Sequence, residues 1–389
     1  MVYVAIIFFI GLFILFYSYI GYGILLWLFR KFNVGKKVSS DDCFQPNVTL
    51  VVAAYNEADF IRNKIENTLQ LNYPLDKLTI IFITDGTTDK TGEVIKQYPK
   101  IIHLHEEIRK GKVAAIQRAM SFVKTPVVIF SDANTFLNKE SVRKIVRHYA
   151  DSEVGGVAGE KKILMGMNEA AAGTGEGLYW KYESYLKKLD SDFYTVVGAA
   201  GELFSIRTEL YEHPGDNTLL DDFVISLTIC KRGFRIIYEP EAFAMENPSE
   251  SIKEEKKRKI RISAGAFQSM LMFKELLNIF KYTKLSFQYI SHRVLRWTIC
   301  PLLLPLLLVL NIVLALNSAS LYYDSMLYIQ VAFYCLALVG GIFSLKKIHF
   351  KPAYVAYYFV FINISLYLGF FRFIQKKQSV LWEKADRKN

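Results

Sequence analysis

The chain has few cysteines, and they lie far apart. Its 389 residues contain only Cys43, Cys230, Cys300 and Cys335, with no Cys-x-x-Cys pair. This pattern excludes a disulfide framework and a cysteine-rich zinc site, and it is typical of a reducing compartment. The motifs Gly-x-x-x-x-Gly-Lys-Ser/Thr and Gly-x-Gly-x-x-Gly are also absent, so neither a P-loop nor a Rossmann dinucleotide site is expected.

Charge is scarce in four long segments. Val2–Leu28 has no charged residue, and three later runs are largely apolar: Leu295–Leu316, Tyr328–Leu345 and Pro352–Ile374. Each is long enough for a helix that crosses a bilayer. The first run exceeds the core of a signal peptide and lacks a small-residue cleavage site, so it predicts a retained anchor.

Basic residues crowd the flanks of these runs. The net charge is +11, and 52% of the residues are apolar. Attraction to an anionic cytoplasmic leaflet explains this placement better than nucleic-acid binding, and it predicts an integral protein of the cell (inner) membrane with a cytoplasmic soluble part. For the last run, simple alternation places the C-terminus outside, whereas the nearby charge favours the inside. The flanking basic residues are Arg30, Lys31, Lys36, Lys37, Lys346, Lys347, Lys376 and Lys377.

The segment 47–247 predicts an α/β domain. Short apolar runs alternate with helical patterns, which argues for a mostly parallel sheet with right-handed crossovers. The predicted strands are Val48–Ala54, Leu78–Thr84, Ile101–His105, Val127–Phe130, Val154–Gly159, Val196–Ile206 and Phe234–Tyr238. The predicted helices are Glu57–Leu71, Lys90–Tyr98, Lys112–Val123, Lys139–Tyr149 and Trp180–Leu189.

Polar clusters follow three of these strands. Side chains at the carboxyl ends of parallel strands line the ligand crevice of an open α/β sheet, where Glu57 or Asp85 could accept hydrogen bonds from a nucleobase or ribose. The alternatives are a first-turn helix residue for Glu57 and a turn at Asp85-Gly86. Asp89 fits an N-cap better than a ligand. The clusters are Tyr55-Asn56-Glu57, Asp85-Gly86-Thr87-Thr88-Asp89 and Ser131-Asp132-Ala133-Asn134.

Two acidic clusters suit catalysis. Asp132 and Asn134, two residues apart at a strand end, offer oxygen ligands for Mg²⁺ or Mn²⁺, with an Asx turn as the alternative. Asp221 and Asp222 are adjacent in a partly apolar setting, which can raise the pKa of one carboxyl group and suits a general base. Helix capping is the alternative for this pair.

Basic residues could meet phosphate at two places. Arg258 and Arg261 share a helical face and carry forked donors, with a solvated face as the default. Their charge run precedes an apolar stretch, which predicts a helix in the headgroup plane or a solvated surface helix. Lys110-Gly111-Lys112 precedes another helix, where a basic residue could also reach phosphate.

The order and spacing of these clusters resemble the family 2 glycosyltransferases. The region Val48–Leu271 is most similar to the membrane-integrated branch with cellulose, hyaluronan, chitin and poly-N-acetylglucosamine synthases. The resemblance lies in a Tyr-Asn-Glu motif, an Asp-Gly-Ser-Thr-Asp motif, a Lys-rich turn, Asp-x-Asp, an acceptor-side strand and Thr-Glu-Asp. The matching residues are Tyr55–Glu57, Asp85–Asp89, Lys110–Lys112, Asp132–Asn134 (Asn replaces the second Asp), Gly198–Gly201 with Ile206-Arg207, and Leu220–Asp222.

This resemblance implies a GT-A-type fold and an inverting transfer of a sugar from a nucleotide-sugar, most simply a UDP-sugar, to a saccharide acceptor. It also implies roles for particular residues. They are Asp222 as the base; Tyr55, Glu57, Asp85 and Lys112 for the donor nucleotide; Asp132 and Asn134 for Mg²⁺ or Mn²⁺; Arg258 and Arg261 for the diphosphate; and Gly201 and Asp221 on the acceptor side.

One family motif matches poorly. Arg258–Ile262 has the spacing of the Gln-x-x-Arg-Trp motif but lacks the Gln and the Trp. The resemblance implies that this Trp stacks on a growing sugar chain, so its absence argues against long-chain processivity. Two alternatives therefore stay open: transfer of one sugar to a polyprenyl phosphate or other lipid, and a non-catalytic nucleotide-sugar-binding membrane protein.

The expected partners are the donor, a saccharide or lipid-linked acceptor, membrane lipids and an oligomer or export partner, with no nucleic acid. Six regions are expected along the chain. They are an anchor (1–30), a basic and polar linker (31–46), the cytoplasmic domain (47–247), basic amphipathic interfacial helices (248–293), a C-terminal membrane region (294–375) and a basic tail (376–389).

Overall fold

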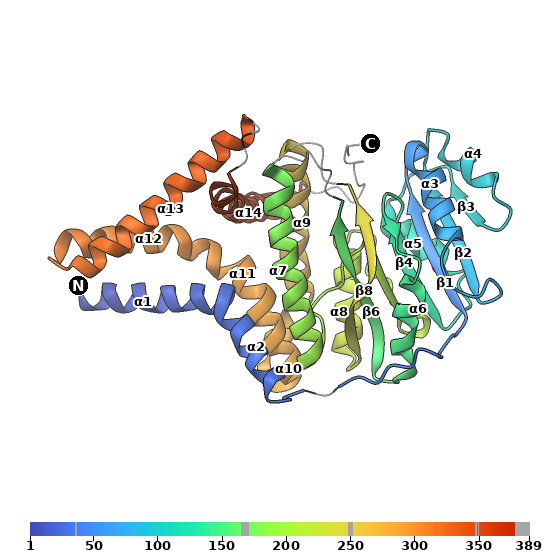
Figure 1. Ribbon diagram of the computed structural model, residues 1–389, viewed down its shortest axis with the longest axis horizontal. Coiled ribbons are helices and arrows are strands. Elements are labelled where there is room, and N and C mark those ends of the chain that lie inside the picture. The colour runs from blue at the N-terminus through green and yellow to red at the C-terminus, as the bar shows by residue number, and fades with distance from the viewer. Residues whose placement is uncertain (36, 165–170, 248–251, 347, 349, 378–389) are drawn as a thin grey trace. The chain divides into compact units, whose positions relative to one another are not determined.

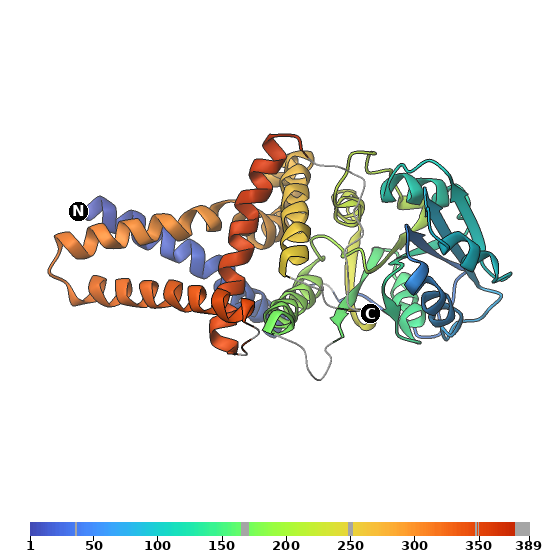
Figure 2. The same ribbon diagram turned by 90° about the horizontal axis from the view of Figure 1, so that it is seen from above.

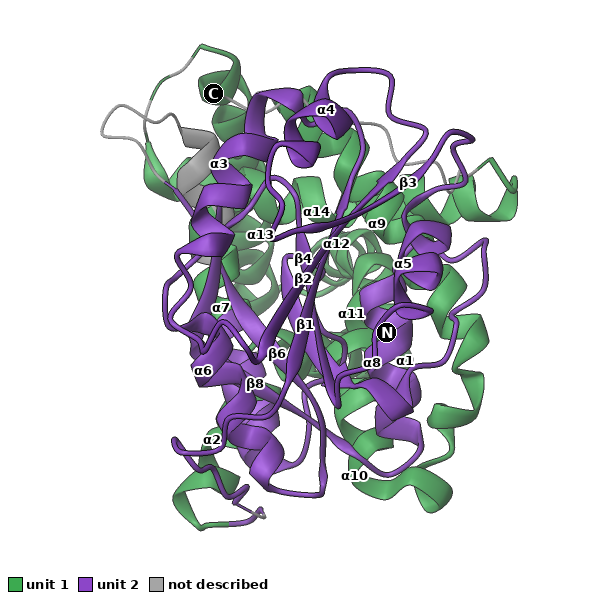
Figure 3. Ribbon diagram, turned by 90° about the vertical axis from the view of Figure 1, so that its right-hand side faces the viewer, with its two compact units in different colours: residues 1–33, 165–183, 251–377 green, residues 34–164, 184–250, 378–389 purple. Residues whose placement is uncertain are grey.

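The computed structural model describes residues 1–35, 37–164, 171–247, 252–346, 348 and 350–377 (Figure 1). It contains two compact units (Figure 3). The membrane unit comprises residues 1–33, 165–183 and 251–377, and the sheet unit comprises residues 34–164, 184–250 and 378–389. The boundaries of these units differ from the expected domain boundaries mainly at 165–183. This segment was expected in the cytoplasmic domain and belongs to the membrane unit. Most of the expected basic tail lies outside the described residues, as do Lys36 and Lys347.

The sheet unit is built on one eight-stranded mixed sheet in the order β3-β2-β1-β4-β7-β6-β8-β5. The first four strands of this order are parallel, and β7 runs antiparallel to both of its neighbours. The mostly parallel sheet is thus confirmed. The strands are β1 (Val48–Ala54), β2 (Leu78–Asp85), β3 (Ile102–Glu106), β4 (Val127–Asp132), β5 (Phe136–Leu137), β6 (Val154–Ile163), β7 (Leu203–Arg207) and β8 (Arg235–Glu246).

Helices cover both faces of this sheet. Figure 3 shows α3 and α6 on one side of the strands and α5 and α8 on the other. β1 is buried along its whole length, which explains its unbroken run of apolar and small residues. The helices are α3 (Ala58–Leu69), α4 (Thr91–Lys96), α5 (Lys112–Met120), α6 (Ser141–Val146), α8 (Asp221–Lys231) and the C-terminal part of α7 (Ala171–Phe193).

The acceptor-side strand is shorter than expected. The sequence predicts a strand over Val196–Ile206, but β7 begins at Leu203. Gly198 lies in the left-handed region with φ 89°, and a Cβ atom there would overlap the Phe223 ring. The residues before β7 therefore form a turn against α8, and this turn carries Gly201.

Among its described residues, the membrane unit has four helices long and apolar enough to cross a membrane, one for each expected run. Many of their large apolar side chains face outward, including Leu338 at 71% exposure, which suits contact with lipid. The four are Val2–Lys31, Ile299–Asn317 (α12), Leu321–Leu345 (α13) and Lys351–Ile374 (α14). The first is built from α1 (Val2–Phe16), a π-helical turn (Tyr17–Gly21) and α2 (Tyr22–Lys31).

The expected interfacial helices are α9 (Ile252–Met272) and α10 (Ile279–Tyr289). A π-helical turn (Ile290–Val294) and α11 (Leu295–Trp297) then lead to α12. α9 packs along α14, as Figures 1 and 2 show. A Cβ atom at Gly369 would lie 2.9 Å from the backbone nitrogen of Ala264, so the two helices approach closely. The small-residue face of α9 is therefore buried against α14, a contact that neither sequence alternative included.

Candidate active site

Three polar clusters lie at the carboxyl ends of β1, β2 and β4. The chain runs from β1 outward to β2 and β3 and then returns to β4 on the other side of β1. In an open α/β sheet, the ligand crevice forms where the strand order reverses in this way. Tyr55 and Glu57 follow β1, and Asp132 ends β4, so both clusters lie at the switch point.

Tyr55 forms one wall at this edge of the sheet. The guanidinium of Arg109 lies 3.6 Å from the centroid of the Tyr55 ring, which is a cation–π contact. Gly86 permits this arrangement because a Cβ atom there would lie 2.5 Å from the Cβ of Arg109. The Tyr55 ring thus holds the Arg109 guanidinium against its face. The expected contact between Tyr55 and the donor nucleotide stays a prediction.

Asp85 is almost fully buried, with 1% of its surface exposed. Its Oδ2 accepts hydrogen bonds from the backbone N–H groups of Lys110 (2.9 Å) and Gly111 (2.6 Å), and its Oδ1 accepts one from Arg118 (3.0 Å). Asp85 therefore holds the loop that leads into α5. This structural contribution was not foreseen, and its expected contact with the nucleotide stays a prediction.

Asp89 holds the first residues of two helices, and it lies one residue before Lys90, the N-cap of α4, rather than at the expected N-cap position itself. It accepts hydrogen bonds from the backbone N–H of Ala58 and from that of Thr91, each at 3.0 Å. These are the first residues of α3 and α4, whose N–H groups have no partner inside their own helices. Glu57 is buried at the N-cap position of α3, one residue before the first turn in which its structural alternative placed it.

Lys112 connects four of the predicted site residues. Its Nζ donates a hydrogen bond to Asp132 Oδ1 at 2.7 Å. A Cβ atom at Gly201 would lie 3.3 Å from that Nζ and 3.2 Å from Asp222 Oδ2. Residues from β4, α5, α8 and the turn before β7 therefore meet around one ammonium group.

The pKa values of Asp222 and Lys112 are both raised in this cluster, with different consequences. Burial raises the pKa of Asp222 to about 7, and the charge of Asp221 adds to the rise, while Lys112 opposes it. Burial acts to lower the pKa of Lys112, but Asp132, Asp221 and Asp222 outweigh that effect and raise it. The site thus holds a permanent cation beside a carboxyl group that titrates near neutral pH, which is the property of a general base.

Asp221 lies at the first turn of α8 and is buried. Its Oδ2 has no hydrogen-bond partner among the described residues. A buried carboxylate oxygen without a partner is costly unless a ligand or water satisfies it. Asp221 is therefore placed to accept a hydrogen bond from a bound molecule.

Lys64 was missed by the sequence analysis. It is fully buried, and its Nζ donates to Ser131 Oγ at 2.7 Å and to the Thr135 carbonyl at 2.8 Å. These contacts fix the loop that carries Asp132 and Asn134. The buried face of α3 includes Ile61, Lys64, Ile65 and Thr68, so the helical apolar period could have revealed a lysine pointing inward.

The predicted diphosphate residues belong to the membrane unit. Arg258 pairs with Glu255 at 3.1 Å on α9, and Arg261 lies on the same helix. The sequence analysis also passed over Arg293-Val294-Leu295-Arg296-Trp297, an Arg-x-x-Arg-Trp sequence at α11. The sequence pattern that could have revealed this segment is two arginines three residues apart, followed by a tryptophan, next to an apolar run.

The side-chain oxygens at the end of β4 suit a hard divalent cation that is bound partly by the protein and partly by a substrate. No group of three or more His, Cys, Asp or Glu side chains that could hold a metal occurs in the described part of the chain. Asp132, with 29% of its side chain exposed, and Asn134 nevertheless offer oxygen ligands at the strand end. Mg²⁺ commonly takes one or two protein carboxylates and completes its shell with phosphate and water.

A family comparison decides the assignment of the sheet unit. Residues 49–213 match the model for "Glycosyl transferase family 2". The chain carries a family 2 glycosyltransferase domain. This match spans β1 to the segment after β7, including the three polar clusters that follow β1, β2 and β4. It confirms the family that the motifs resembled.

Relatives of this glycosyltransferase domain agree with that finding. A poly-beta-1,6-N-acetyl-D-glucosamine synthase of Staphylococcus aureus is 24% identical over 253 residues, which are 62% of this chain and 60% of that protein. A probable glycosyltransferase of Bacillus subtilis, YdaM, is 22% identical over 250 residues, or 59% of this chain and 57% of that one. The chain thus matches about 60% of the length of such relatives.

A solved structure shares the fold over nearly the whole chain. It is the mannosyltransferase PcManGT from Pyrobaculum calidifontis, in complex with GDP-Man and Mn²⁺. The TM-score is 0.70 at 21% sequence identity, covering 94% of this chain and 98% of that one. The GT-A-type fold is therefore confirmed.

Proposed function

We propose that this protein is an inverting glycosyltransferase that moves a sugar from a nucleotide-sugar, a UDP-sugar, to a saccharide acceptor at the membrane. The observation that carries the proposal is the meeting of Lys112, Asp132 and Asp222. Lys112 Nζ lies 2.7 Å from Asp132, and Gly201 leaves open the space beside both Lys112 and Asp222. A positive charge and a titratable base then lie together, as displacement of a diphosphate requires.

Asp222 removes the proton from the attacking acceptor hydroxyl. Its pKa of about 7 lets a large fraction of the carboxyl group be ionised at neutral pH while keeping it basic. The hydroxyl oxygen attacks the anomeric carbon in line with the departing nucleoside diphosphate, so one displacement inverts the configuration. A pKa near neutral favours this reading over a binding protein without turnover.

The donor lies at the switch point between β1 and β4. Tyr55, Glu57 and Asp85 position the nucleotide, and Lys112 contributes positive charge near the diphosphate. When bound, Mg²⁺ or Mn²⁺ at Asp132 and Asn134 supplies further positive charge that stabilises the leaving group. Arg258 and Arg261 are proposed to bind the diphosphate. Asp221 and Gly201 face the acceptor.

The chain resides in the cell (inner) membrane with its sheet unit in the cytoplasm. Arg30 and Lys31 end the first candidate span on the side that leads to the sheet unit. Basic residues at that end of a span favour the cytoplasmic face. The same side holds nucleotide-sugars, so the donor reaches the site directly, and the acceptor lies at the membrane surface.

The decisive experiment incubates the purified full chain with radiolabelled nucleotide-sugars, saccharide acceptors and membrane lipids, with and without Mn²⁺. We expect metal-dependent transfer of label from one nucleotide-sugar. Product length separates a polymer from addition of one sugar to a lipid. Binding of a donor with neither transfer nor hydrolysis under any condition would overturn the proposal.

Asp132→Ala tests the metal site separately. We expect it to weaken Mn²⁺-dependent donor binding, measured by calorimetry, while donor binding without metal changes little. Exposed Asp216→Ala in the same unit serves as the matched control. An unchanged donor affinity for Asp132→Ala in Mn²⁺ would exclude Asp132 as a ligand.

A further inference from the structure

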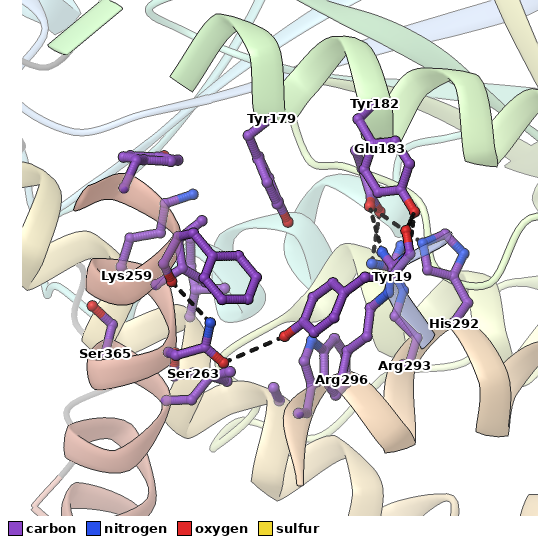
Figure 4. Close-up of a pocket in the computed structure, with 18 of the residues that line it drawn as sticks. Tyr19, Tyr179, Tyr182, Glu183, Lys259, Ser263, His292, Arg293, Arg296 and Ser365 are labelled. Carbon is purple, nitrogen blue, oxygen red and sulfur yellow. Dashed lines mark hydrogen bonds and ion pairs between the residues drawn. The ribbon is translucent and has the colours of Figure 1, made fainter. Parts of the chain in front are cut away.

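The membrane unit contains a cavity of about 430 Å³. Side chains from α7, α9, α14, the first candidate span and the segment around α11 line it (Figure 4). Among its described lining residues, three are cationic and one is a carboxylate: Lys259, Arg293, Arg296 and Glu183. None of the residues assigned to the transfer reaction lines this cavity.

Glu183 and the two arginines form one polar group in this cavity. Arg293 lies 2.7 Å from Glu183, and Arg296 lies 3.8 Å from it. Arg296 also donates hydrogen bonds to the Ser18 carbonyl and to the Tyr182 hydroxyl, each at 2.9 Å. These contacts fix the arginine side chains before any ligand enters. In Figure 4, the group lies on the right-hand side of the cavity.

Lys259 supplies positive charge at the opposite side of the same cavity (Figure 4). It is buried on α9, and its Nζ lies 5.1 Å from the centroid of the Tyr179 ring and 6.0 Å from that of Tyr358. Glu255 lies 3.6 Å from this Nζ. Aromatic faces stabilise the ammonium while leaving it able to make a shorter, charge-assisted contact.

The wall formed by α14, a candidate membrane span, carries an apolar stripe beside the polar residues Asn363 and Ser365. Val355, Phe359, Ile362 and Leu366 line the cavity at helical spacing. Val355 is 44% exposed, so this wall continues onto the outer surface of the helix. Hydrocarbon would fit along this apolar stripe.

We propose that this cavity binds a phosphate-bearing lipid. The phosphate would lie among Lys259, Arg293 and Arg296, and the hydrocarbon chain would lie against α14. Guanidinium and ammonium groups bind phosphate by charge-assisted hydrogen bonds, and buried cations gain most from an added anion because water does not screen them. The lipid is either a polyprenyl phosphate carrier or a bilayer phospholipid, since both join a phosphate to hydrocarbon.

This proposal does not depend on the transfer reaction, so binding is the readout. The purified full chain is delipidated in a neutral detergent and titrated by native mass spectrometry. The probes are a polyprenyl phosphate, phosphatidylglycerol, inorganic phosphate and the neutral polyprenol. The variant is Lys259→Met, with Lys256→Met, an exposed lysine on the same helix, as the matched control.

We expect saturable binding of at least one phosphate-bearing lipid. Lys259→Met should weaken it about tenfold or more, and Lys256→Met should leave it unchanged. Preference for the polyprenyl phosphate identifies a carrier lipid, and preference for phosphatidylglycerol identifies a bilayer lipid. Equal binding of polyprenol, equal binding by Lys259→Met, or binding of inorganic phosphate alone would overturn the proposal.

Val355→Trp keeps the test valid if Lys259→Met fails to fold. The added ring narrows the cavity from α14 without changing any charge, so lipid binding should fall while the thermal melting temperature is kept. Asp222→Asn should bind the lipid as the unaltered chain does. If Asp222→Asn loses transfer but binds the lipid normally, the result supports both the lipid site and the role of Asp222.

Discussion

Each unit contains a carboxylate close to at least one cation, buried Glu183 in one and half-buried Asp222 in the other, and the two groups behave in opposite ways. Burial acts to raise the pKa of Glu183 in the membrane unit, but Arg293, His292 and Arg296 outweigh it and hold the pKa well below the ordinary value. In the sheet unit, burial and Asp221 raise the pKa of Asp222 to about 7 despite Lys112. The number of nearby cations, and the presence of a second carboxylate, account for this difference.

The difference indicates a structural role for the Glu183 carboxylate and a chemical role for that of Asp222. Glu183 has two arginines within 4 Å and stays ionised, so it fixes their positions. Asp222 shares the cation Lys112 with Asp132 and Asp221, so it can exchange a proton near neutral pH. Removing each carboxylate should therefore affect a different property: stability for Glu183 and turnover for Asp222.

Asp222→Asn should have the largest effect on activity. We expect the rate of transfer to fall by about 10²–10⁴, because the acceptor hydroxyl loses its base, while donor binding is retained. Single-turnover kinetics and donor calorimetry measure the two quantities. Because the folded-state pKa of Asp222 is raised from 3.8 to about 7, the stability that its proton supplies is lost as pH rises from about 4 to 7. Above that range the amide should melt no earlier than the acid. Normal turnover in this variant would refute the assignment.

Glu183→Gln should have the largest effect on stability. It leaves Arg293 and Arg296 without their carboxylate, which typically costs about 3–5 kcal/mol for a buried pair. Denaturant unfolding in detergent measures the loss, and Glu212→Gln, in an exposed pair with Arg232, is the control that should change stability little. Because the folded-state pKa of Glu183 is lowered, the difference should shrink as pH falls below about 4.5. A neutral effect at pH 7 would show that the network is not stabilising.

Gly201→Leu should close the sheet-unit site without unfolding it. Its first side-chain atom would lie 3.2 Å from Asp222 Oδ2 and 3.3 Å from Lys112 Nζ, so the larger side chain displaces both groups. A displacement of about 1 Å can cost roughly 10²-fold in rate. Gly92→Ala on α4 is the control, because its Cβ would meet its nearest neighbour at 3.5 Å. Equal activity of the two variants would place the site elsewhere.

The smallest expected effects are shifts of the pH profile. The acidic limb of kcat/KM should lie near pH 7 if Asp222 is the base. Lys112→Gln removes a charge that lowers this pKa, so the limb should move to higher pH; Asp221→Asn removes one that raises it, so the limb should move lower. The apparent pKa of the limb is taken from the shape of the pH profile, so it can be measured even when the variant lowers the maximal rate. Movement in the same direction in both variants would contradict the electrostatic argument.

Local patterns in the sequence predicted much of the sheet unit. The strand Val48–Ala54 has its predicted bounds, and the clusters after β1, β2 and β4 fall at the strand ends as expected. These features depend on apolar period and on residues that end strands, which neighbouring residues determine. The four apolar runs likewise became long helices because length and lack of charge are local properties.

Contacts between distant segments escaped sequence reasoning. Lys64 and Thr135 are 71 positions apart, yet their hydrogen bond holds the Asp132 loop. The turn at Gly198 replaces an expected strand because the Phe223 ring fills the space of a side chain. The cavity around Lys259 is lined by five segments that are far apart in the sequence, and no single segment carries its signal.

The sequence by itself determined which residues end strands, which runs are long and apolar enough to span a bilayer, and which carboxylates stand next to one another. Only the tertiary structure decided which carboxylate titrates near neutral pH and which stays ionised. The physical reason is that a pKa depends on burial and on charges brought within a few ångströms by folding, and neither quantity is a property of local sequence.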